Sequence, residues 1–277
     1  MKANRFTIAK LIFAALLVPA FLLTGCKSEK LNYDAIEVHS HNDYVQANPF
    51  WGAFNAGTPS IEADVYLVDG ELYVAHLKKE LVIVPERTLR SMYLEPLKKE
   101  WDKNGGKPYA DGSPLWLMVD MKRDQHASVS RLVEMIETEG YLPMFDVENN
   151  PNAVKLLVTN LPDIIENHQE DFPEWLYYDG ISNMTLSEKE ASKVAMISDK
   201  ATIYTEWNGE GEMSAEDQAK IKAAVEAAHK IGTTFRLWDF PDCPAAWEMS
   251  VKLGLDWINT DKPAEAVAWL KAKRNSK

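Results

Sequence analysis

The chain has 277 residues, a formal net charge of −12 at pH 7 and only two cysteines. The acidic balance argues against nucleic acid and against charge-driven binding to anionic membrane, and two cysteines cannot form a disulfide framework. The length suits one domain with a full hydrophobic core.

The first residues predict a lipoprotein signal peptide. Basic residues precede the apolar run Leu11–Leu23, which is too short to span a bilayer comfortably. The sequence Leu23-Thr24-Gly25-Cys26 then resembles the bacterial lipobox, in which the cysteine is lipidated. An ordinary signal peptide or a signal anchor is the alternative. The predicted parts are a cleaved peptide over 1–25, a tether starting at the lipidated Cys26 over 26–34, and one domain over 35–277.

This reading predicts a location and an oligomeric state. The protein would be held to a membrane by acyl chains in a bacterial cell envelope, facing the periplasm or the cell surface. We expect a monomer.

Short apolar, β-like runs alternate with helical patterns along the rest of the chain. The predicted strands cover 35–40, 60–67, 72–76, 115–121, 154–160, 177–182, 201–207, 233–239 and 256–261. The stronger predicted helices cover 128–139, 215–231 and 263–273, and weaker ones cover 162–167 and 186–194.

This alternation predicts an α/β fold. About eight strands separated by helices imply parallel pairing with right-handed crossovers. For the roughly 250 residues that follow the signal peptide, a single-domain (β/α)₈ TIM barrel is favoured over an open doubly wound sheet. The sequence has neither a GxGxxG dinucleotide turn nor a P-loop.

Polar residues follow the first predicted strands, where a barrel of this kind carries its active site. The first strand ends at His39 and His41, followed by Asn42. The second carries Glu62 and Asp64, two residues apart and therefore on one face of the strand.

The next runs end in the same way. A turn at Asp69-Gly70 leads to a run that ends at His76, and the third strand ends with Asp120 and Lys122. Acids that close apolar strands are costly to bury, so they indicate a site rather than a solvated face.

These residue types suit the cleavage of a phosphodiester. Three converging carboxylates require a cation, and hard oxygen ligands favour Mg²⁺ or Ca²⁺. Two histidines beside the metal provide a general base and a general acid, and a nearby lysine stabilises an anion.

The order of these blocks resembles the glycerophosphodiester phosphodiesterase-like superfamily, which includes the phosphatidylinositol-specific phospholipases C. In that superfamily the first strand ends in His-Arg-Gly and a proline follows eight residues after the histidine; here Pro49 follows His41 by eight. The later family blocks appear as Glu62-Ala63-Asp64-Val65, Val68-Asp69-Gly70, Val74-Ala75-His76 and Asp120-Met121-Lys122. The motif HSHNDY, with FRLWDFPD and DWINTD late in the chain, resembles most closely the branch similar to yeast altered inheritance of mitochondria protein 6.

The resemblance implies a role for each matching residue. It makes His41 the base and His76 the acid, with Glu62, Asp64 and Asp120 as metal ligands and Lys122 as a phosphate contact. Asn42 stands where the family has arginine, and asparagine cannot form a charged fork on phosphate.

Later strands would supply the rest of the substrate site. We expect substrate contacts from Arg236, Trp238 and Asn259, together with Asn42 and Lys122. His39 would lie one layer deeper and brace the site. The other histidines, His126, His168 and His229, have no partners at motif spacing and are interpreted as surface or structural residues.

The leading hypothesis is a metal-dependent phosphodiester hydrolase that acts on a small phosphodiester or a phospholipid head group. The alternatives are a phosphatidylinositol-specific phospholipase C-like lipase and a barrel that binds phosphate or sugar without turnover. A glycoside hydrolase is disfavoured because Glu62 and Asp64 lie on one strand, too close to flank a glycosidic bond.

Overall fold

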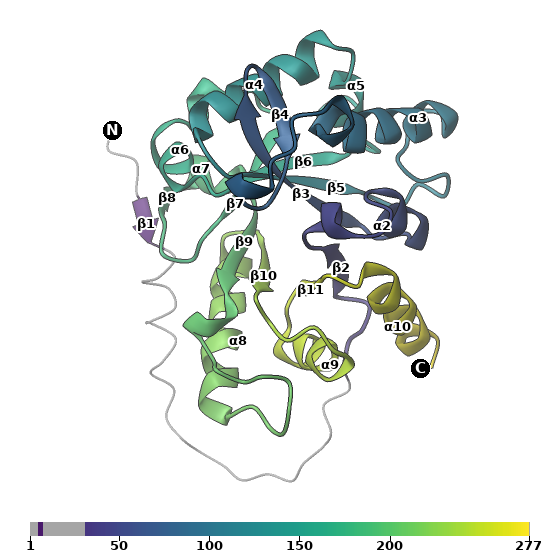
Figure 1. Cartoon of the computed structure of the whole chain (residues 1–277). Helices are drawn as coiled ribbons and strands as arrows, with labels where there is room; N and C mark the ends of the chain where they lie inside the picture. Colours follow the sequence, from purple (N-terminus) through teal and green to yellow (C-terminus); the bar gives the residue numbers. More distant parts are fainter. Residues whose placement is uncertain (1–4, 8–30, 277) are drawn as a thin grey trace.

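Eight parallel strands close into a barrel in the computed structural model, which describes residues 5–7 and 31–276 (Figure 1). In barrel order the strands are β2 (Glu37–Ser40), β3 (Ser60–Val68), β5 (Trp116–Met121), β6 (Lys155–Thr159), β7 (Leu176–Gly180), β9 (Val194–Lys200), β10 (Thr234–Trp238) and β11 (Trp257–Thr260). Strand β2 pairs with both β11 and β3, which closes the barrel. The predicted (β/α)₈ fold is confirmed.

Helices surround the strands on the outside of the barrel (Figure 1). They are α2 (Trp51–Ala56), α3 (Glu95–Lys103), α4 (Gln125–Thr138), α5 (Leu142–Phe145), α6 (Pro162–Asn167), α7 (Glu188–Ser192), α8 (Ala215–Lys230), α9 (Pro244–Leu253) and α10 (Pro263–Asn275). The described ranges also contain six short helical turns: η1 (Asp43–Val45), η2 (Lys78–Glu80), η3 (Pro85–Arg87), η4 (Arg90–Leu94), η5 (Gln169–Asp171) and η6 (Ala201–Ile203).

Local sequence explains the elements. The inner residues of β6 are Leu156, Leu157 and Val158, all fully buried, as expected for a parallel strand covered on both faces. Helix α8 begins where predicted, with the Ser214 hydroxyl accepting a hydrogen bond from the backbone of Asp217.

A hairpin adds one antiparallel strand beside the C-terminal part of β3. Strand β4 (Glu71–Val74) pairs with β3 through the predicted Asp69-Gly70 turn. Both turn residues have positive φ, 49° and 82°, as a two-residue hairpin of this hand requires. The hairpin brings His76 back beside Asp64, in the middle of β3.

One predicted strand is wrong. The run 201–207 begins with the turn η6 and continues as irregular chain, while the strand of this repeat is β9, at 194–200. The predicted weak helix over 186–194 ends earlier, since α7 stops at Ser192. A short apolar run such as Val194–Ser198 does not by itself distinguish a strand from the end of a helix.

The N-terminal predictions fall largely outside the described residues. Residues Arg5–Thr7 form β1, which pairs antiparallel with β8 (Thr185–Ser187). The rest of the predicted signal peptide and the predicted lipidation site Cys26 lie beyond the described ranges. Among the residues that are described, no helix has the length and apolar character needed to cross a membrane.

Asp43 anchors the loop that follows the first barrel strand. Its side chain is fully buried and accepts hydrogen bonds from the Ser40 hydroxyl at 3.0 Å, the Tyr93 hydroxyl at 3.1 Å and the backbone N–H of Phe50. Phe50 directly precedes α2, so one carboxylate ties β2, α2 and η4 together.

We expect Asp43→Ala to lower the free energy of unfolding by about 2–4 kcal/mol, because three buried donors lose their acceptor. Urea denaturation followed by circular dichroism measures the change. The matched control is Asp102→Ala on the surface of α3, where loss of the pair with Lys98 should cost less than about 1 kcal/mol. Equal shifts in the two variants would contradict this role for Asp43.

Candidate active site

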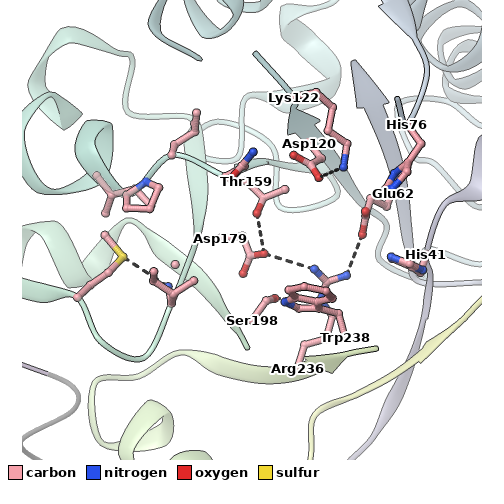
Figure 2. A pocket seen from close by; sticks show the side chains of 17 residues that line it. His41, Glu62, His76, Asp120, Lys122, Thr159, Asp179, Ser198, Arg236 and Trp238 are labelled. Atoms are coloured by element: carbon pink, nitrogen blue, oxygen red, sulfur yellow. Dashed lines mark hydrogen bonds and ion pairs between the residues drawn. The ribbon is translucent and has the colours of Figure 1, made fainter. Parts of the chain in front are cut away.

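A cavity of about 460 Å³ opens at the C-terminal ends of the barrel strands (Figure 2). Most of its polar side chains lie on one side: His41, Glu62, His76, Asp120, Lys122, Asp179 and Arg236. The apolar side is formed by residues after β6 and β7: Leu161, Pro162, Ile165, Ile181 and Met184. Most of the predicted site residues therefore line a real cavity that has one charged and one apolar wall, and the predicted metal ligand Asp64 lies behind this lining.

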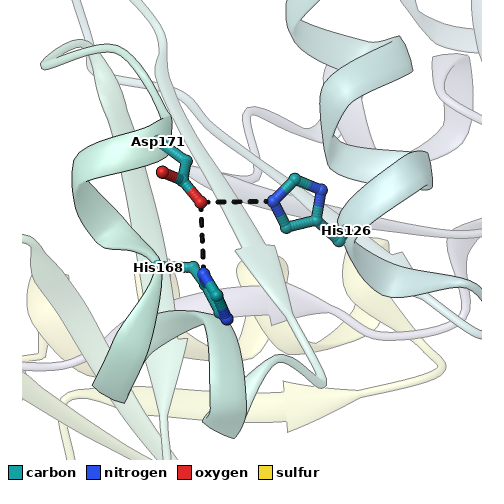
Figure 3. A group of neighbouring side chains, drawn as sticks. All are labelled: His126, His168 and Asp171. Carbon is teal, nitrogen blue, oxygen red and sulfur yellow. Dashed lines mark hydrogen bonds and ion pairs between the residues drawn. The ribbon is translucent and has the colours of Figure 1, made fainter.

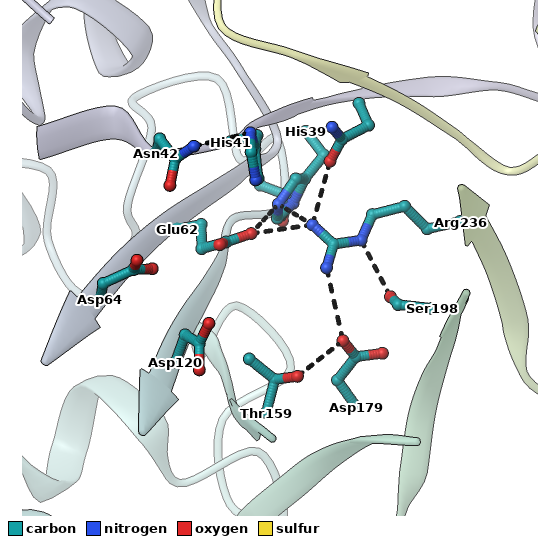
Figure 4. A network of polar contacts seen from close by, with 12 residues as sticks. His39, His41, Asn42, Glu62, Asp64, Asp120, Thr159, Asp179, Ser198 and Arg236 are labelled. Carbon is teal, nitrogen blue, oxygen red and sulfur yellow. Dashed lines mark hydrogen bonds and ion pairs between the residues drawn. The ribbon is translucent and has the colours of Figure 1, made fainter. Parts of the chain in front are cut away.

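Arg236 occupies the centre of a buried network at the floor of the cavity (Figure 4). Its guanidinium donates to Glu62 at 2.8 Å, to the Ser198 hydroxyl at 2.9 Å and to the Asn259 side-chain oxygen at 3.1 Å. A longer contact of 3.4 Å reaches Asp179. Burial would raise the pKa of Glu62, but the adjacent Arg236 and the neighbouring histidines hold it well below its usual value.

His39 belongs to the same floor. Its Nδ1 lies 2.8 Å from the Ser60 hydroxyl, and its Nε2 lies 2.7 Å from Glu62 and 2.5 Å from Arg236. Complete burial, together with the positive charge of Arg236, lowers the pKa of His39 to about 4. His39 is therefore neutral at pH 7 and braces the floor, in line with the sequence interpretation.

Glu62, Asp64 and Asp120 converge above this floor. One carboxylate oxygen from each lies within 4.8 Å of the others. The Oδ1 atoms of Asp64 and Asp120 are buried and have no hydrogen-bond partner among the described residues. Buried oxygens without a partner are expensive, and a hard cation is the kind of ligand that satisfies them.

Lys122 bridges two of these acids. Its ammonium nitrogen lies 2.7 Å from Asp64 Oδ2 and 2.6 Å from Asp120 Oδ2. Burial and the charge of Asp64 nevertheless raise the pKa of Asp120 to about 6, so the single ammonium does not fully compensate the pair. Negative potential is left at the two Oδ1 atoms.

Two histidines flank the acids, and each is oriented by a carboxylate. His41 Nδ1 lies 2.8 Å from Asp261 Oδ1, and His76 Nδ1 lies 2.8 Å from Asp64 Oδ2. Both rings line the cavity, and the Nε2 atoms have no hydrogen-bond partner within the described ranges. Burial opposes protonation of His41, but the charges of Glu62 and Asp261 raise its pKa overall. Each histidine thus has one ring nitrogen fixed and the other available.

The remaining predicted substrate contacts lie in different places. Trp238 lines the cavity and is 37% exposed. Asn42 and Asn259 are absent from the cavity lining. The Asn42 amide lies between His41 and the Tyr44 hydroxyl, which also donates to Asp64 at 2.7 Å.

The structure adds residues that sequence reasoning missed. Asp179, at the end of β7, is buried, and burial raises its pKa to about 7; the Thr159 hydroxyl donates to it at 3.0 Å. An acid that closes an apolar strand was the signal used for Asp120, and the same signal is present here. Asp261 ends the run DWINTD, but nothing in its spacing pointed to His41.

A TIM barrel with an acid trio, a lysine and two carboxylate-paired histidines at its catalytic end has the features expected of a phosphodiesterase. The family model of the AIM6-like phosphodiesterase domain matches residues 30–160. This match covers all the predicted histidine and metal-ligand positions and confirms the predicted resemblance, and with it the predicted class of phosphoric diester hydrolase.

Whole-chain comparisons agree with this assignment. The altered inheritance of mitochondria protein 6 homolog of Arthroderma benhamiae is 28% identical over 262 residues, covering 82% of this chain and 81% of that protein. The altered inheritance of mitochondria protein 6 of Lachancea thermotolerans is 26% identical over 276 residues, covering 81% of this chain but only 63% of that protein.

One solved structure has the same fold. A glycerophosphodiester phosphodiesterase from Parabacteroides distasonis superposes with a TM-score of 0.53 and 16% identity, over 87% of this chain and 98% of that one. At this level of identity the likeness supports the barrel fold alone.

The predicted location is wrong. A bacterial cell-envelope lipoprotein was expected, whereas the matched relatives from Arthroderma benhamiae and Lachancea thermotolerans are fungal and therefore eukaryotic. The lipobox-like pattern around Cys26 is a short motif, and such motifs match by chance more readily than a fold does.

We expect Arg236→Met to lower the free energy of unfolding by about 3–5 kcal/mol, because the buried Glu62 carboxylate loses its main counter-charge. Guanidinium denaturation measures the change. As a control, Lys189→Met removes an exposed pair with Glu170 and should cost less than about 1 kcal/mol. A loss at Arg236 as small as that of the control would show that Glu62 needs no compensation.

Proposed function

We propose that the protein is a metal-dependent phosphodiester hydrolase in which His41 and His76 perform acid–base catalysis. The observation that carries this proposal is the pair of histidines with carboxylate-bound Nδ1 atoms, placed on either side of buried carboxylate oxygens that lack partners. Acid–base pairs of this kind suit transfer of a proton to and from substrate oxygens near neutral pH.

Glu62, Asp64 and Asp120 would hold the metal. Their donors are all oxygens, which favours Mg²⁺ or Ca²⁺. Including Asp179, the described part of the site has four carboxylates, three of them buried and that of Asp120 partly buried, against the two cations Arg236 and Lys122, an imbalance that a divalent ion would reduce. A bound ion of this type polarises phosphoryl oxygens.

The histidines would divide the proton transfers. His41, held by Asp261, takes the proton from the attacking hydroxyl, which by analogy with the superfamily is a neighbouring hydroxyl of the substrate. The hydroxyl oxygen forms a bond to phosphorus as the bond from phosphorus to the leaving oxygen breaks, and His76, held by Asp64, gives that leaving oxygen a proton. Water then opens the resulting cyclic phosphate, which completes the hydrolysis. Because both Nδ1 atoms are occupied, each ring exchanges protons through Nε2 alone.

Lys122 is the cation placed to contact phosphate. Its nitrogen lies beside the two acids and lines the cavity. Arg236, in contrast, has its donors directed to protein acceptors, so its main effect is to fix Glu62. The apolar wall and Trp238 would receive the non-phosphate part of a glycerophosphodiester or of a phospholipid head group.

We expect His41→Ala and Asp64→Ala each to lower kcat/KM on a glycerophosphodiester by at least about 100-fold, through loss of the base and of a metal ligand. Chelation should abolish turnover, and Mg²⁺ or Ca²⁺ should restore it. A coupled assay of released glycerol phosphate measures the activity. A parallel assay of phosphatidylinositol hydrolysis tests the phospholipase C-like alternative.

The matched control is His229→Ala, which removes a histidine paired with Asp256 at 2.8 Å, away from the cavity. This variant should retain wild-type activity. Wild-type turnover by His41→Ala would refute the proposal. If the wild-type protein binds metal and phosphodiester but hydrolyses neither the glycerophosphodiester nor phosphatidylinositol, the non-catalytic binding barrel would instead be favoured.

The pH profile provides an independent test. His41 must be neutral to act as a base, and the negative charge of Asp261 raises its pKa. Asp261→Asn should therefore lower the pKa of His41 and move the acid limb of the kcat/KM profile to lower pH. Asp239→Asn removes an equal charge paired with Lys200 and should leave that limb in place. A shift to higher pH in Asp261→Asn would contradict the assignment of His41 as base.

A further inference from the structure

His126, His168 and Asp171 come together outside the cavity (Figure 3). His126 lies in the first turn of α4, while His168 and Asp171 lie at the end of α6 and in η5. All three side chains are about half exposed, so an ion from solvent can reach them. Sequence reasoning treated both histidines as isolated, because they are far apart in the chain.

The distances in this cluster differ from those of the other histidine–carboxylate pairs. Asp171 Oδ2 lies 3.3 Å from His126 Nε2 and 3.2 Å from His168 Nδ1. The other close pairs, at His39, His41, His76 and His229, measure 2.7 or 2.8 Å. With metal–ligand bonds of about 2.0–2.1 Å, the edge of a tetrahedron around Zn²⁺ is about 3.3 Å, which is close to the two distances from Asp171 Oδ2.

We propose that these three residues form a second metal site, selective for Zn²⁺ or a similar borderline transition ion. Two imidazole nitrogens and one carboxylate oxygen are the donors that such ions prefer, in contrast to the all-oxygen acid trio in the cavity. The fourth position would be taken by water. This proposal does not depend on the proposed hydrolase function.

Polar groups also lie near the second ring nitrogens. His168 Nε2 faces Asp163 Oδ2 at 3.8 Å, and Asn167 fixes that carboxylate through a hydrogen bond of 2.9 Å to Oδ1. His126 Nδ1 faces the Ser130 hydroxyl at 3.5 Å. Polar groups behind ligating histidines set the ring orientation and strengthen the ligand.

The position gives the metal a structural consequence. Helix α4 follows β5, which carries Asp120, and the α6–η5 segment follows β6. The start of α6 supplies Leu161, its N-cap, and Pro162, its first residue, which line both the catalytic cavity and a neighbouring hollow that contains His126 and His168. A metal that links α4 to η5 would hold the apolar wall of the cavity in place.

Zinc binding to the full-length chain, prepared without an affinity tag, tests the site. Excess Mg²⁺ is present to occupy the oxygen-only site, and Zn²⁺ is titrated in competition with a chromophoric chelator. We expect one tight equivalent in the wild type, and its loss or at least a tenfold weaker affinity in His126→Ala and His168→Ala. With Co²⁺ in place of Zn²⁺, visible d–d absorption typical of a tetrahedral site should appear only in the wild type.

Two controls separate this site from others. His229→Ala removes an equally exposed histidine that has a single carboxylate partner, and should keep the zinc equivalent. Asp64→Ala disrupts the acid trio and should also keep it. Unchanged zinc affinity in His126→Ala and His168→Ala, or loss of the equivalent in Asp64→Ala alone, would overturn the proposal.

Discussion

The ion pair between Arg236 and Glu62 is the interaction on which the rest of the site depends. A carboxylate inside a barrel loses its hydration and is tolerated only with a close counter-charge and hydrogen bonds. Arg236 provides both, since its fork reaches Glu62 while its other donors reach Ser198, Asn259 and Asp179. These partners come from four barrel strands, β3, β7, β9 and β11, and Arg236 itself lies on β10, so one side chain cross-links much of the barrel end.

The fixed floor leaves the layer above it free for chemistry. Glu62 uses Oε2 for Arg236 and His39, whereas Asp64 and Asp120 direct their Oδ2 atoms to Lys122. The Oδ1 atoms of Asp64 and Asp120 are left without partners, and Asp120 lines the cavity. A site of this kind is held in place before any ligand arrives, which lowers the cost of binding one.

The parts of the fold and of the site that could be predicted from the sequence are those set by residues close together in the chain. The barrel followed from alternating strands and helices, and the hairpin from Asp69-Gly70, because both are set by short-range patterns. Strand β9 was missed because its apolar run follows a capped helix closely. The His41–Asp261 contact joins the two ends of the domain, and only closure of the barrel between β2 and β11 brings these residues together.

Asn42 shows how a departure from the family pattern is absorbed. Its backbone is left-handed, with φ of 47°, a conformation that asparagine tolerates better than most residues, and its amide joins His41 to Tyr44. An arginine here would bring a positive charge next to His41, whereas asparagine brings none. Arg236 is ion-paired with Glu62. Lys122 is therefore the cation of the described cavity lining that remains to contact phosphate, and it is already ion-paired with two carboxylates. Under the proposed hydrolase function, an anionic phosphodiester would meet net negative charge there, so a divalent ion would assist substrate binding as well as the chemical step.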